Sequence, residues 1–211
     1  MARIKPLMAL DPNARSTGRY TIRSLYFDDL QNSCFFENED GVDQRSKFRI
    51  RIYNHNSGEI RLEQKEKLRG KTLKHGCDIS LEQCKLLMRG IPPNEKDQPF
   101  LLQKLCVLMR TRLMRPKVIV EYERIPYVHA LGNVRITFDY NIRSSCDISS
   151  FLSEDIPNRP FMPQGQHLLE VKFDQFLPDA IARQAQLDML QLTNYSKYYQ
   201  CMKYRLGGSS L

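Results

Sequence analysis

Apolar and charged residues alternate along several segments of the chain with a period of two. In SKFRIRIY (46–53), Arg49 and Arg51 alternate with apolar residues, and in LLEVKF (168–173) Glu170 does the same. Successive side chains on a β-strand point to opposite faces of the sheet. Each of these segments is therefore predicted to be a strand with one charged face and one apolar face.

The same alternation, interrupted by turn residues, predicts seven strands. Their ranges are 20–28, 46–54, 59–68, 70–76, 117–128, 134–143 and 167–174. Gly58 and Gly132 fall between consecutive segments and are expected to close antiparallel hairpins, because strands that follow one another in the chain usually pair.

Helical periodicity occupies the middle of the chain and its C-terminal part. Ser80 followed by Gln83 is the pattern of a capping box, so a helix is predicted to begin there. A second helix is expected near 100–113, and a third from Pro178, since proline is favoured in the first turn. These amphipathic helices are expected to cover the outside of the sheet.

Three segments lack a regular period. The N-terminal segment Met1–Ala14 is interpreted as the end of a helix that leads into the first strand, and 147–166 as a long irregular loop. Residues 206–211 are expected to be a disordered tail. Without internal repeats, the 211 residues predict a single domain spanning 1–211.

Composition adds a preference for anionic partners. The formal net charge is +8 and the isoelectric point about 9.2, while hydrophobic (41%) and charged (27%) contents are ordinary for a globular protein. Charge alone leaves nucleic acid, an acidic membrane surface and phosphorylated small molecules open. Strands with few interleaved aromatic residues argue against nucleic acid.

Several classes of protein are disfavoured. No segment reaches 18 apolar residues and the N-terminus does not resemble a signal peptide, so a cytoplasmic location is expected. The six cysteines show no CxxC spacing, and the chain has no Gly-rich phosphate loop, G-x-S-x-G or H-E-x-x-H motif. Nothing in the sequence indicates an oligomeric state.

The charged strand faces allow two arrangements. An ordinary sandwich would bury the apolar faces and leave the charges in solvent. An inverted barrel would place the apolar faces outward under the helices and enclose the charges. Enclosed cations cost several kcal/mol each, so the second arrangement requires carboxylates, water or a bound polyanion inside. The alternation alone leaves both open.

An ordered set of motifs along most of the chain resembles the VTC family. These are polyphosphate polymerase domains of the triphosphate tunnel metalloenzyme fold, related to the CYTH phosphatases and cyclases. The motifs are YTIRSLYFD, KFRIRIY, RLEQKEKLRGKTLK, RPKVIVEYER, NVRITFDYNI, LLEVKFDQFLPD and YSKY. The resemblance implies an α+β fold: an eight-stranded antiparallel β-barrel tunnel with a charged interior and helices outside.

The resemblance also implies an activity and a site. Family members transfer the terminal phosphoryl group of ATP to a growing polyphosphate chain with Mn²⁺ or Mg²⁺, so ATP and polyphosphate are the expected partners. Carried over motif by motif, the expected catalytic residues are Arg49, Arg51, Lys65, Arg124 and Arg135, the substrate-binding residues Lys74, Lys172 and Lys197, and the metal ligand Glu170.

One departure from the family pattern keeps other functions open. Family members begin with a strand that carries an E-x-K-Y-like motif, which is not found in this chain, so the first tunnel strand is expected to be missing. The alternatives are a hydrolase for triphosphate or polyphosphate on the same fold, and a catalytically inactive module that binds polyphosphate or nucleotide.

Overall fold

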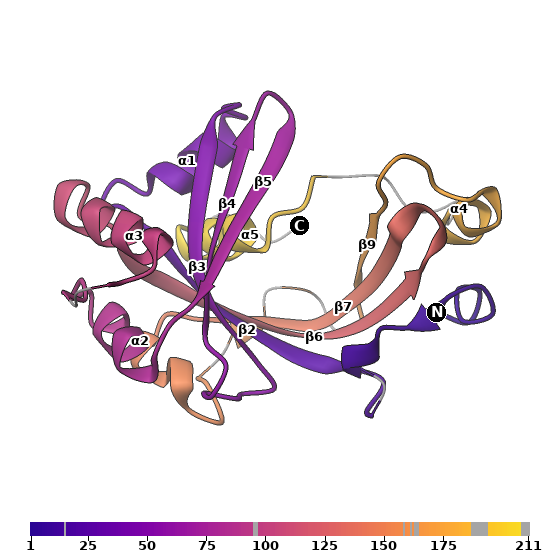
Figure 1. Ribbon diagram of the computed structural model, residues 1–211, viewed down its shortest axis with the longest axis horizontal. Helices are drawn as coiled ribbons and strands as arrows, with labels where there is room; N and C mark the ends of the chain where they lie inside the picture. Colours follow the sequence, from indigo (N-terminus) through magenta and orange to yellow (C-terminus); the bar gives the residue numbers. More distant parts are fainter. Residues whose placement is uncertain are drawn as a thin grey trace. The chain divides into compact units, whose positions relative to one another are not determined.

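Long strands with alternating faces make up most of the secondary structure (Figure 1). The computed structural model describes residues 1–14, 16–94, 97–157, 159–160, 162, 165–186 and 194–207. The strands are β1 (Ala9–Leu10), β2 (Tyr20–Asp28), β3 (Arg45–Tyr53), β4 (Arg61–Leu68), β5 (Lys71–Asp78), β6 (Arg115–His129), β7 (Val134–Ser145), β8 (Arg159–Pro160) and β9 (Leu168–Lys172). All seven predicted strands are confirmed, and β1 and β8 are two further strands of two residues each.

Helices flank the strands. They are α1 (Ser33–Glu39), α2 (Leu81–Met88), α3 (Phe100–Thr111), α4 (Asp179–Ala185) and α5 (Lys197–Arg205), with 3-10 turns η1 (Pro12–Ala14), η2 (Leu131–Asn133) and η3 (Ile148–Leu152). The three predicted helices correspond to α2, α3 and α4. Part of the predicted final helix (187–193) and the end of the predicted tail (208–211) lie outside the described residues. No helix in the described part of the chain is long and apolar enough to cross a membrane.

Hydrogen bonds join the strands in the order β5-β4-β3-β2-β6-β7-β8, while β1 pairs with β6 and β9 with β7. Every pairing whose register is known is antiparallel. The α+β class and the antiparallel sheet are therefore confirmed. The sheet has nine strands rather than eight, and among the described residues its pairing ends at β5 without closing into a ring.

Two elements differ from the sequence prediction. The segment Met1–Ala14 is not the end of a helix: it forms hydrogen-bonded turns, then β1 and η1.

The helices α1 and α5 were not predicted. α1 begins beside Asp28, whose carboxylate accepts the backbone N–H groups of Cys34 (2.9 Å) and Phe35 (3.2 Å). A carboxylate at a helix N-terminus satisfies donors that have no partner within the helix.

The chain divides into two units, each with its own packing. Unit 1 comprises Met1–Thr21, Tyr122–Ile142 and Met162–Tyr195, and unit 2 comprises Ile22–Glu121, Arg143–Phe161 and Ser196–Leu211. Strands β2, β6 and β7 contribute residues to both units. The single domain expected from the sequence stays a prediction.

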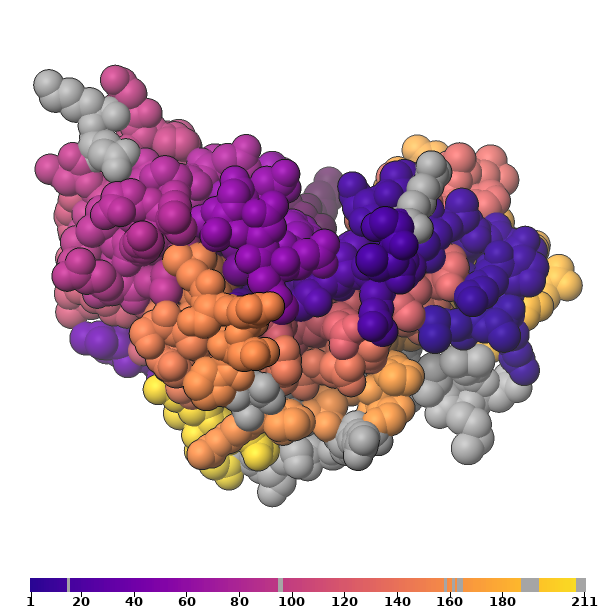
Figure 2. Space-filling view, turned by 90° about the horizontal axis from the view of Figure 1, so that it is seen from below, coloured from indigo at the N-terminus to yellow at the C-terminus, as the bar shows by residue number. Residues whose placement is uncertain are grey.

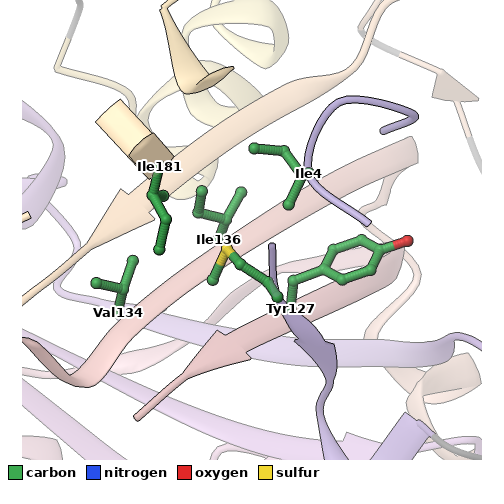
Figure 3. Close-up of a cluster of buried hydrophobic side chains, with 6 residues drawn as sticks. Ile4, Tyr127, Val134, Ile136 and Ile181 are labelled. Atoms are coloured by element: carbon green, nitrogen blue, oxygen red, sulfur yellow. The ribbon is translucent and has the colours of Figure 1, made fainter. Parts of the chain in front are cut away.

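In unit 1 the apolar strand faces are covered by the N-terminal segment and α4 (Figure 3). The buried cluster consists of Ile4, Met8, Tyr127, Val134, Ile136 and Ile181. Partly buried Phe138, Leu169 and Val171 extend it along β7 and β9. The neighbours of these residues on the opposite face are Arg135, Thr137, Asp139, Glu170 and Lys172, so the apolar face is the one that lies under helices.

In unit 2 the same separation holds. Phe48, Ile50 and Leu62 are buried, whereas Arg49 and Glu63, one residue further along their strands, face the other way. Helix α3 packs on β4 and β5 and buries Leu102 and Leu105. The turn η3 lies against α2, and Figure 2 shows this segment, in orange, on the surface of unit 2.

Tight turns set the register of the hairpins. In the β6–β7 turn, Gly132 has a φ of +75°, a conformation that glycine adopts without steric cost. A Cβ atom at this position would lie 2.5 Å from the carbonyl oxygen of Phe176. The sequence prediction that Gly132 closes a hairpin is confirmed, and the close approach of the Phe176 carbonyl provides a second reason for glycine at this position.

Candidate functional site

The two arginines of the R-x-R motif lie on one face of β3 in unit 2. Arg49 Nε donates to Glu63 Oε2 at 2.7 Å, and Arg49 Nη2 lies 2.7 Å from the same oxygen. Arg49 Nη1 donates to the Tyr26 hydroxyl at 3.1 Å. Arg51 lies 3.5 Å from Glu63 Oε1 and donates to Ser24 Oγ at 3.4 Å. One carboxylate therefore holds both guanidinium groups in place.

Glu63 comes from β4, directly opposite Arg49 in the antiparallel register. Burial opposes ionisation of this carboxyl, but the charges of Arg49 and Arg51 outweigh burial and hold the pKa of Glu63 below its usual range. Glu63 is thus an anion that forms ion pairs with both arginines. Its charged neighbours in the structure are these two cations.

Three lysines meet in register beside the arginine pair. Lys65 of β4 faces Lys47 of β3 on one side and Lys74 of β5 on the other. We call these three residues the lysine row, and the lysine row together with Arg49, Arg51 and Glu63 the cationic face of unit 2. Like charges directly opposite one another destabilise a sheet, so this register is costly unless an anion is bound nearby.

Helices α1 and α5 pack over one end of the cationic face. Lys47 Nζ donates to Asn38 Oδ1 of α1 at 3.1 Å and to Ser196 Oγ at 3.5 Å, and Ser196 caps α5. Lys197, a predicted substrate-binding residue, is the first residue of α5. The chain thus brings the start of α5 to the end of the lysine row.

A second charged cluster belongs to unit 1. Arg124 of β6 makes a two-pronged contact with Asp139 of β7, with Nε 2.6 Å from Oδ1 and Nη2 2.8 Å from Oδ2. Arg124 Nη2 also lies 3.7 Å from Glu170 Oε2 of β9, and Lys172 Nζ lies 2.9 Å from Glu170 Oε1. Burial disfavours the charged guanidinium, but the hydrogen bonds to Asp139 outweigh it and raise the pKa of Arg124. The cluster holds two cations and two carboxylates.

Arg135 has a different neighbour from the other predicted residues. Its Nη2 lies 2.7 Å from Oδ2 of the buried Asp11, just after β1, and its side chain is 45% exposed. Arg135 faces Lys172 in the β7–β9 register, so it shares the charged face of unit 1. The exposed part of the side chain is accessible to an anion, while Asp11 fixes its position.

Glu170 is the metal ligand that the family resemblance implies. The described residues contain no group of three or more His, Cys, Asp or Glu side chains arranged for a metal. Glu170 is 39% exposed, and Thr137, opposite it in register, has a buried hydroxyl without a hydrogen-bond partner. One accessible carboxylate with a hydroxyl beside it fits Mg²⁺ or Mn²⁺ held mainly by phosphates and water, not by protein alone.

The most buried ion cluster of unit 2 lies on the apolar face. Arg23 is fully buried and contacts Glu121, which also contacts Arg143 and, at 3.2 Å, His55 Nε2. Arg23 also donates to the carbonyl oxygen of Phe151 at 3.0 Å. Because its donors are used by protein groups, this cluster holds the 151–154 segment in place rather than a ligand. The strand pattern gave no signal for it, since Arg23 and Glu121 come from strands 98 residues apart in sequence.

The antiparallel sheet, with its cationic face in unit 2 and its mixed charged face in unit 1, defines an α+β protein with surfaces suited to anions. The family model of the VTC domain matches residues 1–205, so the chain belongs to the VTC domain family. A search among curated proteins found no match. Among solved structures, a protein from Bacillus halodurans, provisionally described as an adenylate cyclase, is similar, with 12% sequence identity and a TM-score of 0.45. The match covers 100% of this chain and 86% of that one; likeness at this level carries no functional argument.

Proposed function

We propose that this VTC domain transfers the terminal phosphoryl group of ATP to polyphosphate. The bond between the γ-phosphorus and the β–γ bridging oxygen breaks, ADP leaves, and a terminal oxygen of the acceptor chain forms the new P–O–P bond. That oxygen is already anionic near neutral pH, so the reaction needs no dedicated base. Catalysis then depends on positioning and on neutralising charge on the phosphate oxygens.

The observation that carries the proposal is the cationic face of unit 2 within a chain of this family. Arginine forks bind two oxygens of one phosphate, while lysines act as movable point charges, and both types occur side by side on this face. We assign phosphate binding to Arg49, Arg51, Lys65, Lys74 and Lys197 in unit 2, and to Arg124, Arg135 and Lys172 in unit 1.

We assign the divalent metal to Glu170, with Mn²⁺ or Mg²⁺ as the ion. When bound, the metal would neutralise charge on phosphate oxygens. Lys172 and Arg124 lie beside the Glu170 carboxylate and orient it before it meets a ligand. Asp139 is excluded from this role in the proposal because Arg124 uses both of its oxygens.

The compartment is also part of the proposal. All six cysteines are free, and Cys34, Cys84, Cys106 and Cys201 are buried. Free thiols suit a reducing compartment, and ATP is abundant in the cytoplasm. We therefore propose a cytoplasmic location for the domain.

The test follows the phosphorus NMR spectrum of ATP incubated with the purified chain and Mn²⁺. Signals of internal phosphates that grow together with ADP are the expected result. Orthophosphate without polymer would replace the proposal by hydrolysis of the same substrates. If the ATP signals stay unchanged, the chain does not catalyse transfer under these conditions. The remaining hypothesis would then be a module that binds polyphosphate without turning it over.

A matched variant separates the chain's own activity from a contaminant. Arg49→Glu places a negative charge beside Glu63 and should abolish polymer formation. Arg110→Glu makes the same change on the exposed surface of α3 and should leave it intact. Equal activity in both variants would assign the product to another protein in the preparation.

A further inference from the structure

Lys47 differs from the other lysines of the row in how it is held. Its ammonium group lies under α1 and α5, where its two hydrogen-bond acceptors, Asn38 Oδ1 and Ser196 Oγ, are neutral. It also lies 5.2 Å from the centre of the Tyr198 ring. Lys47 is half-buried, and a half-buried cation with neutral hydrogen-bond partners loses part of the solvation that it has in water.

The charged groups around Lys47 do not replace that solvation. The charged groups that face it are Asp28 of β2, Glu37 of α1, Arg45 of β3 and Lys65 of β4; the neutral Cys34 thiol of α1 and the Tyr198 ring of α5 also face it. Asp28 is fully buried, and it already accepts hydrogen bonds from Cys34 N, Phe35 N and the Tyr198 hydroxyl. Arg45 and Lys65 repel the ammonium group.

The consequence is a cation that is only partly charged near physiological pH. Burial, followed by the charges of Arg45 and Lys65, lowers the pKa of Lys47 to about 8. Burial also keeps the Cys34 thiol protonated by raising its pKa, so no thiolate stabilises Lys47. At about pH 8.5, the neutral form of the Lys47 side chain would predominate.

The register shows where the missing negative charge would come from. Lys47, Arg49 and Arg51 alternate on one face of β3, and Lys65 lies directly opposite Lys47. A chain of phosphates bound along Arg49 and the lysine row would pass Lys47 and supply the charge that its own surroundings lack. The geometry thus couples occupation of the cationic face to the protonation of one lysine.

We propose that Lys47 is a further phosphate-binding residue of unit 2 and that a polyphosphate chain bound to the lysine row takes up a proton at Lys47. This inference rests on the proposed function, because it requires polyphosphate on the cationic face. It adds a residue that the motif comparison does not assign and a dependence on pH that arises from α1 and α5. Below about pH 7 Lys47 is already protonated, and binding at such a pH should take up no proton at this site.

Calorimetry at about pH 8.5 tests the proposal with the full chain and long-chain polyphosphate, whose inner phosphates are fully ionised. Binding measured in two buffers with different ionisation enthalpies gives the number of protons taken up. The expected result is uptake of a large fraction of a proton, but less than one, for the natural chain, and clearly less for Lys47→Arg, because arginine stays charged in both states. The difference between the two proteins removes any contribution of the polyphosphate ends.

Affinity provides the second readout. Lys47→Met should weaken binding about tenfold at pH 7, since one charged contact is lost. Lys47→Arg should bind within a few-fold of the natural chain, and Lys85→Met, an exposed lysine on α2, should not differ from it. Thermal unfolding checks that each variant is folded, and if Lys47→Met is not, the Arg variant alone decides the question.

The possible results separate this inference from the proposed function. Polyphosphate binding with equal proton uptake in the natural chain and in Lys47→Arg would overturn the role of Lys47 and leave the proposed function intact. Absence of polyphosphate binding by the natural chain would overturn both. Uptake that is present in the natural chain and lost in Lys47→Arg supports both.

Discussion

At the scale of single residues, the Arg49 guanidinium is already paired with a carboxylate before any ligand binds. Its Nε and Nη2 groups both contact Glu63, which leaves Nη1, shared with Tyr26, as the remaining edge. A phosphate that binds Arg49 must either displace Glu63 from Nε and Nη2 or approach from the Nη1 side. Glu63 therefore competes with anions for the two arginines while it holds both guanidinium groups in place.

The first prediction concerns this pair. Arg51→Glu should lower the affinity for polyphosphate at least a hundredfold, because it removes a cation and places a second carboxylate beside Glu63. Arg110→Glu has the same formal charge and should change the affinity less than threefold. Fluorescence titration with polyphosphate at physiological salt measures both, and similar losses in the two variants would mean that only net charge matters.

The second prediction concerns Glu170. Glu170→Gln should abolish metal-dependent turnover of ATP while polyphosphate binding without metal persists, because the amide keeps its size but loses its charge. Glu82→Gln, an exposed carboxylate on α2, is the matched control. Product formation by Glu170→Gln at the natural rate would remove this residue from the metal role.

Some residue contacts were predictable and others were not. The alternation of NVRITFDYNI places Asp139 on the charged face of its strand, and there it is paired with Arg124. The burial of Lys47 was not anticipated, because it depends on Asn38 and Ser196, which lie 9 and 149 residues away in the chain. Strand alternation assigns a face to a side chain but not what packs over that face.

At the scale of elements, the sequence predicts best where one local rule decides. Period-two alternation located β2 to the residue, and the Ser80–Gln83 box located the start of α2. Helices α1 and α5 were not predicted because their sequences lack a clear apolar stripe at helical spacing. α1 is held instead by the carboxylate of Asp28, which the Tyr198 hydroxyl of α5 also contacts.

The third prediction tests the capping box of α2. Ser80 Oγ accepts the backbone N–H of Gln83 at 3.1 Å, and Gln83 Oε1 accepts the N–H of Ser80 at 3.0 Å. Ser80→Ala should lower the free energy of unfolding by about 1 kcal/mol, because the backbone N–H of Gln83 loses its side-chain acceptor. Urea titration measures it. Ser57→Ala, in the exposed β3–β4 turn, should change stability by much less.

At the scale of the whole molecule, buried carboxylates make stability depend on pH. Burial opposes the ionisation of Glu63 and Glu121, but Arg49 and Arg51 in the first case, and Arg143 and Arg23 in the second, hold both pKa values below the ordinary 4.5. A carboxyl whose pKa is lower in the folded state stabilises the fold above its unfolded pKa. That stabilisation disappears as the pH falls through the folded pKa.

The fourth prediction follows from the sign of this linkage. The free energy of unfolding should be nearly constant from pH 7 to about pH 5 and should decrease steeply below about pH 4.5. Glu63→Gln should flatten part of that decrease, and Glu82→Gln should not. Urea titrations at a series of pH values measure the slope, and identical slopes in all three proteins would mean that Glu63 does not cause the loss of stability in acid.

The in-register lysines also have a consequence for handling the protein. A row of cations beside two arginines attracts mobile anions, and a long polyanion that replaces them gains the entropy of their release, so its affinity falls steeply with salt. At low ionic strength the cationic face should retain whatever polyanion the cell provides, nucleic acid included. Protein purified without a high-salt wash is therefore expected to carry such cargo and to show weaker affinity for added polyphosphate than washed protein.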